Sequence, residues 1–179
     1  MSPEDAIFIH CPIENGDNVM KNKLAITAVE NASPKAPLVL RGDLVQSVLK
    51  AAEIGYGAIE FHVLDIEGFP VKAVTEACRN EGLTVSAVAT GHYFIRHNLC
   101  ITSADIDNRN AAMKEMYRFI DLAADIDTTD GIIIGWAKGT CPEQGQQAYF
   151  DLLAEQLDSL GRFATERNQK ILLEVINRY

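Results

Sequence analysis

The sequence predicts an α/β protein built on a parallel sheet. Five short apolar runs are separated by four longer stretches in which apolar residues recur at helical spacing, so strand and helix alternate along the chain. Repeated strand–helix units imply parallel strands, either in a doubly wound sheet or in a (β/α)8 barrel. No strand-to-helix loop carries a G-x-G-x-x-G or G-x-x-x-x-G-K-[ST] fingerprint, which disfavours a nucleotide-binding sheet and favours the barrel.

The composition fits one globular domain with a core of its own. Hydrophobic residues make up 47% and charged residues 23% of the 179 residues, and the net charge is −9. This acidity disfavours a nucleic-acid partner, whose phosphates Lys and Arg would have to neutralise. No apolar run is long enough to cross a membrane, and the acidic start shows no signal peptide.

The cysteine spacing indicates reduced thiols. The four cysteines are Cys11, Cys78, Cys100 and Cys141. No two of them lie close enough in sequence to form a metal knuckle or a redox pair. We therefore expect free thiols in a cytoplasmic protein.

The start of the chain differs in pattern from the residues after it. Pro3, Pro12 and Gly16 interrupt the first residues, whereas Met20 is succeeded by a basic and then an apolar run. We expect residues 1–19 to be an N-terminal extension or a misassigned start. Residues 20–179 are expected to form the N-terminal portion of a barrel.

The first half of the alternation has clear boundaries. Residues 24–28 are predicted as the first strand, and a proline-containing loop comes next. Asp43 is an N-cap candidate and Gly55 a stop signal, so the first helix is expected between them. Residues 58–63 form the predicted second strand.

The second and third helices are predicted around the third strand. Pro70 is expected at the first position of the second helix, and Gly82 ends that helix. Residues 83–89 form the third strand, and a loop runs from residue 90 to residue 106. Asp107 is the N-cap candidate of the third helix.

The last elements lead to a carboxylate. Residues 131–135 are apolar throughout, which fits a strand that is covered on both faces. A long helix over residues 146–168 precedes a strand at residues 171–173 that we expect to be buried. Glu174 comes directly after this strand. Ligands of parallel α/β folds bind at the carboxyl ends of strands, so chemistry is expected at Glu174. The helical residues expected to face the core are Leu44, Val45, Val48, Leu49, Ala52, Val71, Val74, Ala77, Cys78, Ala112, Met116, Phe119, Ile120, Ala123, Leu152, Leu153, Leu157, Leu160 and Ala164.

The chain resembles the xylose isomerase-like TIM barrels, a superfamily of sugar isomerases and epimerases that also contains the endonuclease IV group. The most specific stretch is Leu-Leu-Glu-Val-Ile-Asn-Arg-Tyr at residues 172–179, which is similar to a family strand ending in Leu-Glu-Pro-Leu-Asn-Arg-Tyr-Glu. Val175 stands where proline is usual, and the chain ends before the second glutamate. The likeness is greatest to ketose 3-epimerases of the tagatose/psicose type and to 5-keto-L-gluconate epimerases. Weaker matches are residues 41–44, 54–60, 89–91 and 133–135, and Gly139.

The resemblance implies a metal-assisted proton transfer. In that family, strand five supplies a carboxylate that binds a divalent metal (Mn²⁺, Mg²⁺ or Co²⁺) and moves a proton, and Glu174 matches this position. Asn177 and Arg178, in the same motif, are then substrate-binding residues. The remaining ligands are an Asp, a His and a Glu on strands six to eight, which we do not expect in this chain. A complete barrel needs about 250 residues.

The chemistry explains why those ligands matter. Epimerisation beside a carbonyl removes a C–H proton and returns one to the opposite face, which takes two carboxylates and a stabilised enolate. One carboxylate does not fix an ion that prefers about six donors. We therefore expect no metal on this chain alone, and no activity.

Other polar side chains are predicted near strand ends. Glu60 and His62 alternate with apolar residues in the second strand, and they are either substrate contacts or a hydrogen-bonded core pair. His92 comes after the third strand and is either a substrate contact or a solvated loop residue. Trp136 comes after the fourth strand and is either a platform for sugar stacking or packing under a loop.

The function implied by the resemblance is that of an isomerase or epimerase acting on a small sugar, a ketose or a keto-sugar acid. Whether this chain is itself an active enzyme stays open. Three alternatives remain: a non-catalytic fragment that pairs with a separate chain, an inactive gene remnant, and an endonuclease IV-like branch, which the net charge of −9 disfavours. Open strand edges lead us to expect self-association or a missing C-terminal half.

Overall fold

The computed structural model describes residues 24–33 and 38–176. Within them six parallel strands form one sheet in the order β2-β1-β3-β4-β5-β6. The strands are β1 (Ala25–Val29), β2 (Leu40–Arg41), β3 (Ala58–His62), β4 (Thr84–Ala89), β5 (Ile132–Ile134) and β6 (Ile171–Leu173). The helices are α1 (Leu44–Ile54), α2 (Val71–Glu81), α3 (Gly91–Arg96), α4 (Ile106–Asp125) and α5 (Gln146–Glu166), with a short 3₁₀ turn η1 (Trp136–Lys138). The expected residues 1–19 extension lies outside the described residues.

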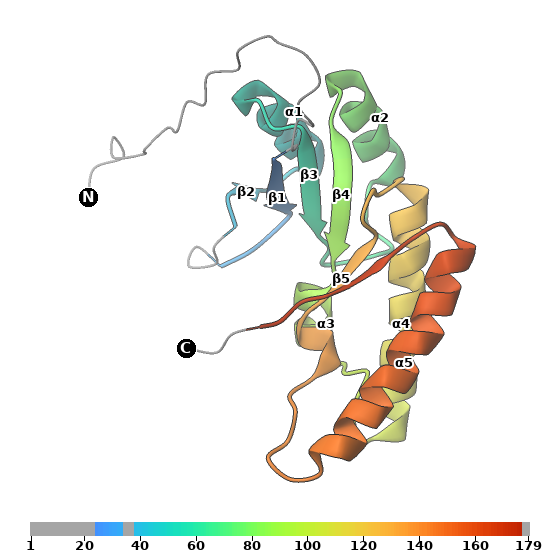
Figure 1. Cartoon of the computed structure of the whole chain (residues 1–179). Coiled ribbons are helices and arrows are strands. Elements are labelled where there is room, and N and C mark those ends of the chain that lie inside the picture. The colour runs from blue at the N-terminus through green and yellow to red at the C-terminus, as the bar shows by residue number, and fades with distance from the viewer. Residues whose placement is uncertain (1–23, 34–37, 177–179) are drawn as a thin grey trace.

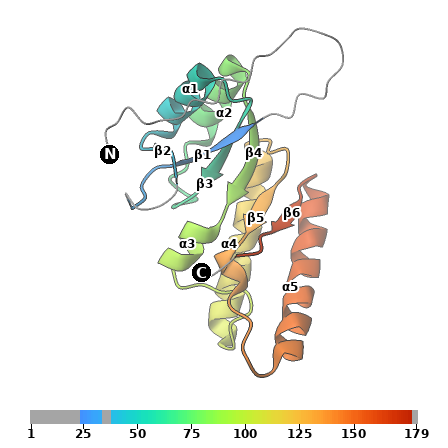
Figure 2. The same cartoon turned by 60° about the vertical axis from the view of Figure 1, so that its left-hand side comes forward.

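The α/β alternation is confirmed, and the sheet with its helices is part of a TIM barrel. The long helices α1, α2, α4 and α5 lie along one side of the sheet, and α3 lies near the ends to which the strand arrows point (Figure 1). The view turned by 60° shows β6 beside β5 at the edge of the sheet, with α5 leading into it (Figure 2).

Two elements were not expected, so the prediction of five strands and four helices is wrong in number. The two-residue strand β2 pairs with β1 through Ala28 and Leu40, and thereby covers the outer edge of β1. It is too short to show a period of its own and depends on that pairing. The second is α3, which occupies part of the expected loop at residues 90–106. Its six residues are fewer than the window in which a helical period can be seen.

Side-chain and glycine caps fix both ends of α1, the end of α2 and the start of α4. The Asp43 carboxylate accepts a hydrogen bond from the Gln46 N–H at 2.9 Å, and Gly55 ends α1 in the left-handed conformation, as predicted. The prediction that Asp107 caps α4 is wrong, because Asp105 accepts from the Asp107 N–H instead. Pro70 is the N-cap of α2 rather than its first residue.

The core lies between the sheet and the long helices. Ile59 and Phe61 of β3 are fully buried, and so are Met116 and Phe119 of α4. The predicted inward faces of α2 and α4 are confirmed, including the burial of Cys78. The prediction fails at Leu49 of α1, which is exposed because Ser47 and Ala51 share the buried face with Val48.

The predicted burial of the strand at residues 171–173 is wrong. Leu172 is 40% and Leu173 46% exposed. The strand pairs with β5 on one side, and among residues 24–33 and 38–176 no strand pairs with its other side. An edge strand keeps one row of backbone groups and the adjoining side chains open to solvent, which accounts for the exposure.

Candidate active site

The polar strand-end residues share the face of the sheet that carries no long helix. Side chains paired across a parallel ladder point to the same face. His62 pairs with Ala89, Ala89 with Ile133, and Ile133 with Leu172. Glu174 lies two residues beyond Leu172, and the alternation therefore places it on the same face as His62. The neighbouring row, with Phe61, faces the core.

Glu174 lies at the edge of the sheet, against β5. Its backbone N–H donates to the carbonyl of Ile134 at 3.0 Å, which extends the β5–β6 ladder by one residue. Its side chain is exposed and its carboxylate lies over Gly135. The backbone of Glu174 is thus held at the carboxyl end of β6, and its carboxylate lies on an accessible surface.

Glu60 and His62 form a pair on β3. Nε2 of His62 lies 3.2 Å from Oε1 of Glu60, and the two side chains are 22% and 21% exposed. The ring of His92, at the start of α3, lies 5.2 Å from that of His62 at an angle of 51°. The β3–β4 register shifts between Ile59 and Phe61, and beyond this shift His62 is aligned with Ala89 at the end of β4. The Glu60–His62 pair is therefore partly exposed, and the ring of His92 lies beside it.

The environment of His92 favours its neutral form. Burial, and then the nearby His62, lower the pKa of His92 below its ordinary value. Nδ1 of His92 is buried and has no hydrogen-bond partner among the described residues. The neutral imidazole offers one donor and one acceptor nitrogen to a hydroxyl group.

We expect this lowered pKa to give a pH-dependent stability. The unfolded chain binds a proton at His92 more readily than the folded chain, so the free energy of unfolding should fall as the pH drops below about 6.5. Thermal melts of wild type and His92→Gln between about pH 7.5 and pH 5 should show a shallower slope for the variant. His97→Gln, which alters an exposed histidine that ends the same helix, serves as the control. Equal slopes for His92→Gln and wild type would contradict the assignment.

Trp136 lies next to α3, just beyond the carboxyl end of β5. Its side chain is 44% exposed, and its Cδ1 lies 3.4 Å from the place that a Cβ on Gly91 would take. The turn that carries it is held by neighbouring elements, because the Ile101 N–H donates to the Ala137 carbonyl at 2.9 Å. A rigid, partly exposed indole is suited to stacking on a sugar ring.

Sequence reasoning assigned no role to three residues that shape this site, namely Thr90, Gly135 and Lys138. Thr90 is fully buried, and its hydroxyl donates to the Ile133 carbonyl at 2.9 Å. The Lys138 ammonium donates to the Gly135 carbonyl at 2.9 Å. The sequence marks them only by their position just after an apolar run, and residues of many kinds share that position. Asn177 and Arg178, predicted as substrate contacts, lie outside the described residues.

The donors present do not by themselves fit a divalent metal. Among residues 24–33 and 38–176, no group of three or more His, Cys, Asp or Glu side chains lies close enough to hold an ion. Glu174 supplies one carboxylate where about six donors are preferred. The acidic turn with Asp125, Asp127 and Asp130 belongs to the end of α4 and also forms no such group.

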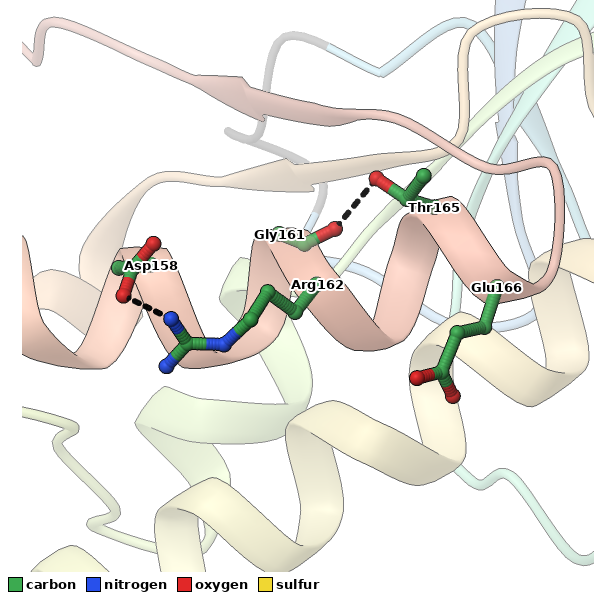
Figure 3. A pocket seen from close by; sticks show the side chains of 5 residues that line it. All are labelled: Asp158, Gly161, Arg162, Thr165 and Glu166. Carbon is green, nitrogen blue, oxygen red and sulfur yellow. Dashed lines mark hydrogen bonds and ion pairs between the residues drawn. The ribbon is translucent and has the colours of Figure 1, made fainter.

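A hollow on α5 lies away from the strand ends. It is lined by Asp158, Gly161, Arg162, Thr165 and Glu166, all from this one helix (Figure 3). The side chains of Asp158 and Arg162 pair at 2.5 Å, and the Thr165 hydroxyl donates to the Gly161 carbonyl at 2.8 Å. One helix face supplies every group of this hollow. The side chains of Asp158 and Arg162 pair with each other, and that of Glu166 pairs with Arg167 outside the hollow, so we do not assign the site here.

The fold and the strand-end residues define an α/β protein of the TIM-barrel type with its polar site at the carboxyl ends of the strands. The family model of the xylose isomerase-like TIM barrel matches residues 48–179. The chain belongs to this family. No curated protein matches the chain in sequence. Within the described residues, no helix has the length and apolar character that a membrane span requires.

Several solved structures share the fold. L-ribulose 3-epimerase is 18% identical, with a TM-score of 0.68 over 88% of this chain and 50% of its own. The 3-keto-D-glucoside 4-epimerase of E. coli is 16% identical, with a TM-score of 0.64 over 87% of this chain and 58% of its own. D-psicose 3-epimerase, solved in the presence of D-fructose, is 16% identical, with a TM-score of 0.65 over 87% of this chain and 53% of its own. The chain thus spans about half the length of these structures.

Proposed function

We propose that this chain contributes one half of the active site of an isomerase or epimerase that acts on a ketose or keto-sugar acid. The observation that carries the proposal is the placement of Glu174 at the carboxyl end of β6, on the face shared with His62. The family to which the chain belongs and the epimerases among the similar folds favour this chemistry. The exposed indole of Trp136 supplies a surface on which a sugar ring can stack.

In this proposal Glu174 exchanges the proton of a carbon that adjoins a carbonyl. A carboxylate at this place can act as the general base that accepts that proton. The Glu60–His62 pair and neutral His92 bind substrate hydroxyls on the same face. A divalent ion such as Mn²⁺, Mg²⁺ or Co²⁺ would stabilise the enolate. Because the described residues do not hold such an ion, we assign its other ligands and the second acid–base group to a partner segment.

The partner in this proposal continues the sheet beyond β6. The outer edge of β6 has no neighbour among the described residues, and Leu173 beside it is 46% exposed. A strand pairing there would cover both the backbone groups and the apolar side chains. We propose that turnover requires this addition. A separate chain and a C-terminal continuation would meet the requirement equally.

Ketose binding can be measured on the chain itself, because Trp136 is its one tryptophan. We expect L-ribulose, D-psicose and D-fructose to change the Trp136 emission saturably, with dissociation constants on the order of millimolar. Glu174→Gln should weaken the binding of the best ligand by roughly 3- to 10-fold, because a charged hydrogen bond is lost. Glu166→Gln, which removes an exposed carboxylate from α5, is the matched control and should bind as wild type does.

Two outcomes would contradict the proposal. One is an emission that no ketose alters at concentrations well above the expected constants. The other is an equal loss of affinity in Glu174→Gln and Glu166→Gln, which would show a general charge effect instead of a contact at the end of β6. The polyol sorbitol, which lacks a carbonyl, should bind more weakly than the ketoses.

A further inference from the structure

We propose that Gly135 is a positioning residue that sets the direction of the Glu174 carboxylate. This inference rests on the proposed function for its catalytic meaning. A Cβ at residue 135 would meet Oε2 of Glu174 well inside van der Waals contact, and would lie 3.6 Å from Cδ of the same side chain. It would also lie 3.3 Å from Cδ1 of Ile176. The bare backbone of Gly135 is therefore the surface on which the carboxylate lies.

The backbone around Gly135 is held on both sides. The Ile133 carbonyl accepts hydrogen bonds from the N–H and the hydroxyl of Thr90, at 3.2 and 2.9 Å. The Ile134 carbonyl accepts from the N–H of Glu174 at 3.0 Å, and the Gly135 carbonyl accepts from the Lys138 ammonium at 2.9 Å. Three consecutive carbonyls of the chain thus accept hydrogen bonds, from Thr90, Glu174 and Lys138. A new side chain at residue 135 cannot be relieved by moving the backbone without breaking one of these bonds.

The Glu174 side chain is the part that would move. It is exposed, and its carboxylate is the far end of a flexible side chain, so its rotation costs little. We therefore expect Gly135→Ala to turn the carboxylate away from its place over β5 while leaving the fold intact. Gly135 then acts on the proposed chemistry through Glu174. A displacement of the carboxylate by about 1 Å is enough to weaken a proton transfer.

A double-mutant cycle tests the coupling between the two residues. Wild type, Gly135→Ala, Glu174→Ala and the double variant are titrated with the ketose that binds best, using the Trp136 emission. Gly135→Ala should lower affinity roughly as much as Glu174→Ala does, about 3- to 10-fold, and should cause no further loss once residue 174 is alanine. The melting temperature of Gly135→Ala should stay within about 4 °C of wild type. Gly161→Ala, where an added Cβ meets nothing within 4 Å, is the control.

A second readout keeps the inference separate from ketose binding. The side-chain carboxyl carbon of Glu174, assigned by its loss in Glu174→Gln, should shift its NMR resonance in Gly135→Ala and keep it in Gly161→Ala. If wild type binds no ketose, the proposed function fails and this resonance alone decides the role of Gly135. An unshifted resonance overturns the inference. Equal affinity losses from Gly135→Ala with and without the Glu174 side chain also overturn it.

Discussion

Replacing Gly131 with alanine should release β6 from the sheet and destabilise the chain by about 2–5 kcal/mol. Gly131 has a φ of +82°, a conformation that L side chains rarely adopt. An added Cβ would meet the Lys170 carbonyl oxygen well inside van der Waals contact and would lie 2.7 Å from the Lys170 nitrogen. These are backbone atoms, so no side-chain rotation relieves the contact. The same carbonyl accepts from the Ile132 N–H at 3.1 Å, the bond that begins the β5–β6 ladder.

Gly82→Ala separates the two causes of this loss. Gly82 has a φ of +70°, and nothing lies within 4 Å of an added Cβ there. Its substitution should cost only the left-handed conformation, about 1–2 kcal/mol. Thermal melts should therefore rank Gly131→Ala below Gly82→Ala, and hydrogen exchange should quicken at the β6 amides in Gly131→Ala alone. Equal melting temperatures for the two variants would show that the contact with Lys170 is not limiting.

Local signals account for the parts of the fold that the sequence predicts well. The start and end of α1 were predicted at Asp43 and Gly55, because a capping carboxylate and a left-handed glycine act within one turn of the chain. Asp105 and Asp107 both had the chemistry of a cap for α4. Only the backbone conformation selects Asp105, and the sequence does not contain that information.

Pairing and burial at the sheet edges depend on distant parts of the chain. β2 exists because Leu40 and Arg41 meet β1, and no pattern in two residues could predict it. The apolar run from Ile171 to Leu173 is typical of a strand that is covered on both faces. Leu172 and Leu173 are nevertheless exposed. An apolar run therefore predicts that a strand is suited to burial, but it does not predict whether a neighbouring element covers that strand.

The residues of the candidate site could be predicted from their type and their position along the chain, whereas the contacts between them could not. Glu174 and Trp136 were expected at strand ends because polar and aromatic residues come after apolar runs there. The approach of His92 to His62 depends on the shift in the β3–β4 register, which alternation alone does not specify. The contact between Gly135 and Glu174 likewise joins the residues that follow β5 and β6, and it depends on the pairing of these two strands.

The exposed edge of β6 should make the chain self-associate at micromolar concentration. Leu172 and Leu173 are 40% and 46% exposed, and Val175 is 92% exposed. Each large apolar side chain left in water forgoes roughly 1.5–3 kcal/mol of burial, and the open strand adds unpaired backbone groups. Pairing at the other edge of the sheet is less favoured, because the two-residue strand β2 already covers β1 there. The net charge of −9 opposes association, so the effect should grow with salt.

Leu173→Lys should shift the chain toward monomer, because a lysine on an edge strand discourages pairing. Leu49→Lys is the matched control, since it makes the same charge change at an exposed leucine of α1, away from β6. Sedimentation velocity over a range of micromolar concentrations should give a mass that rises with concentration for wild type and Leu49→Lys and stays near one chain for Leu173→Lys. A wild-type chain that sediments as a monomer throughout would show that the β6 edge does not pair.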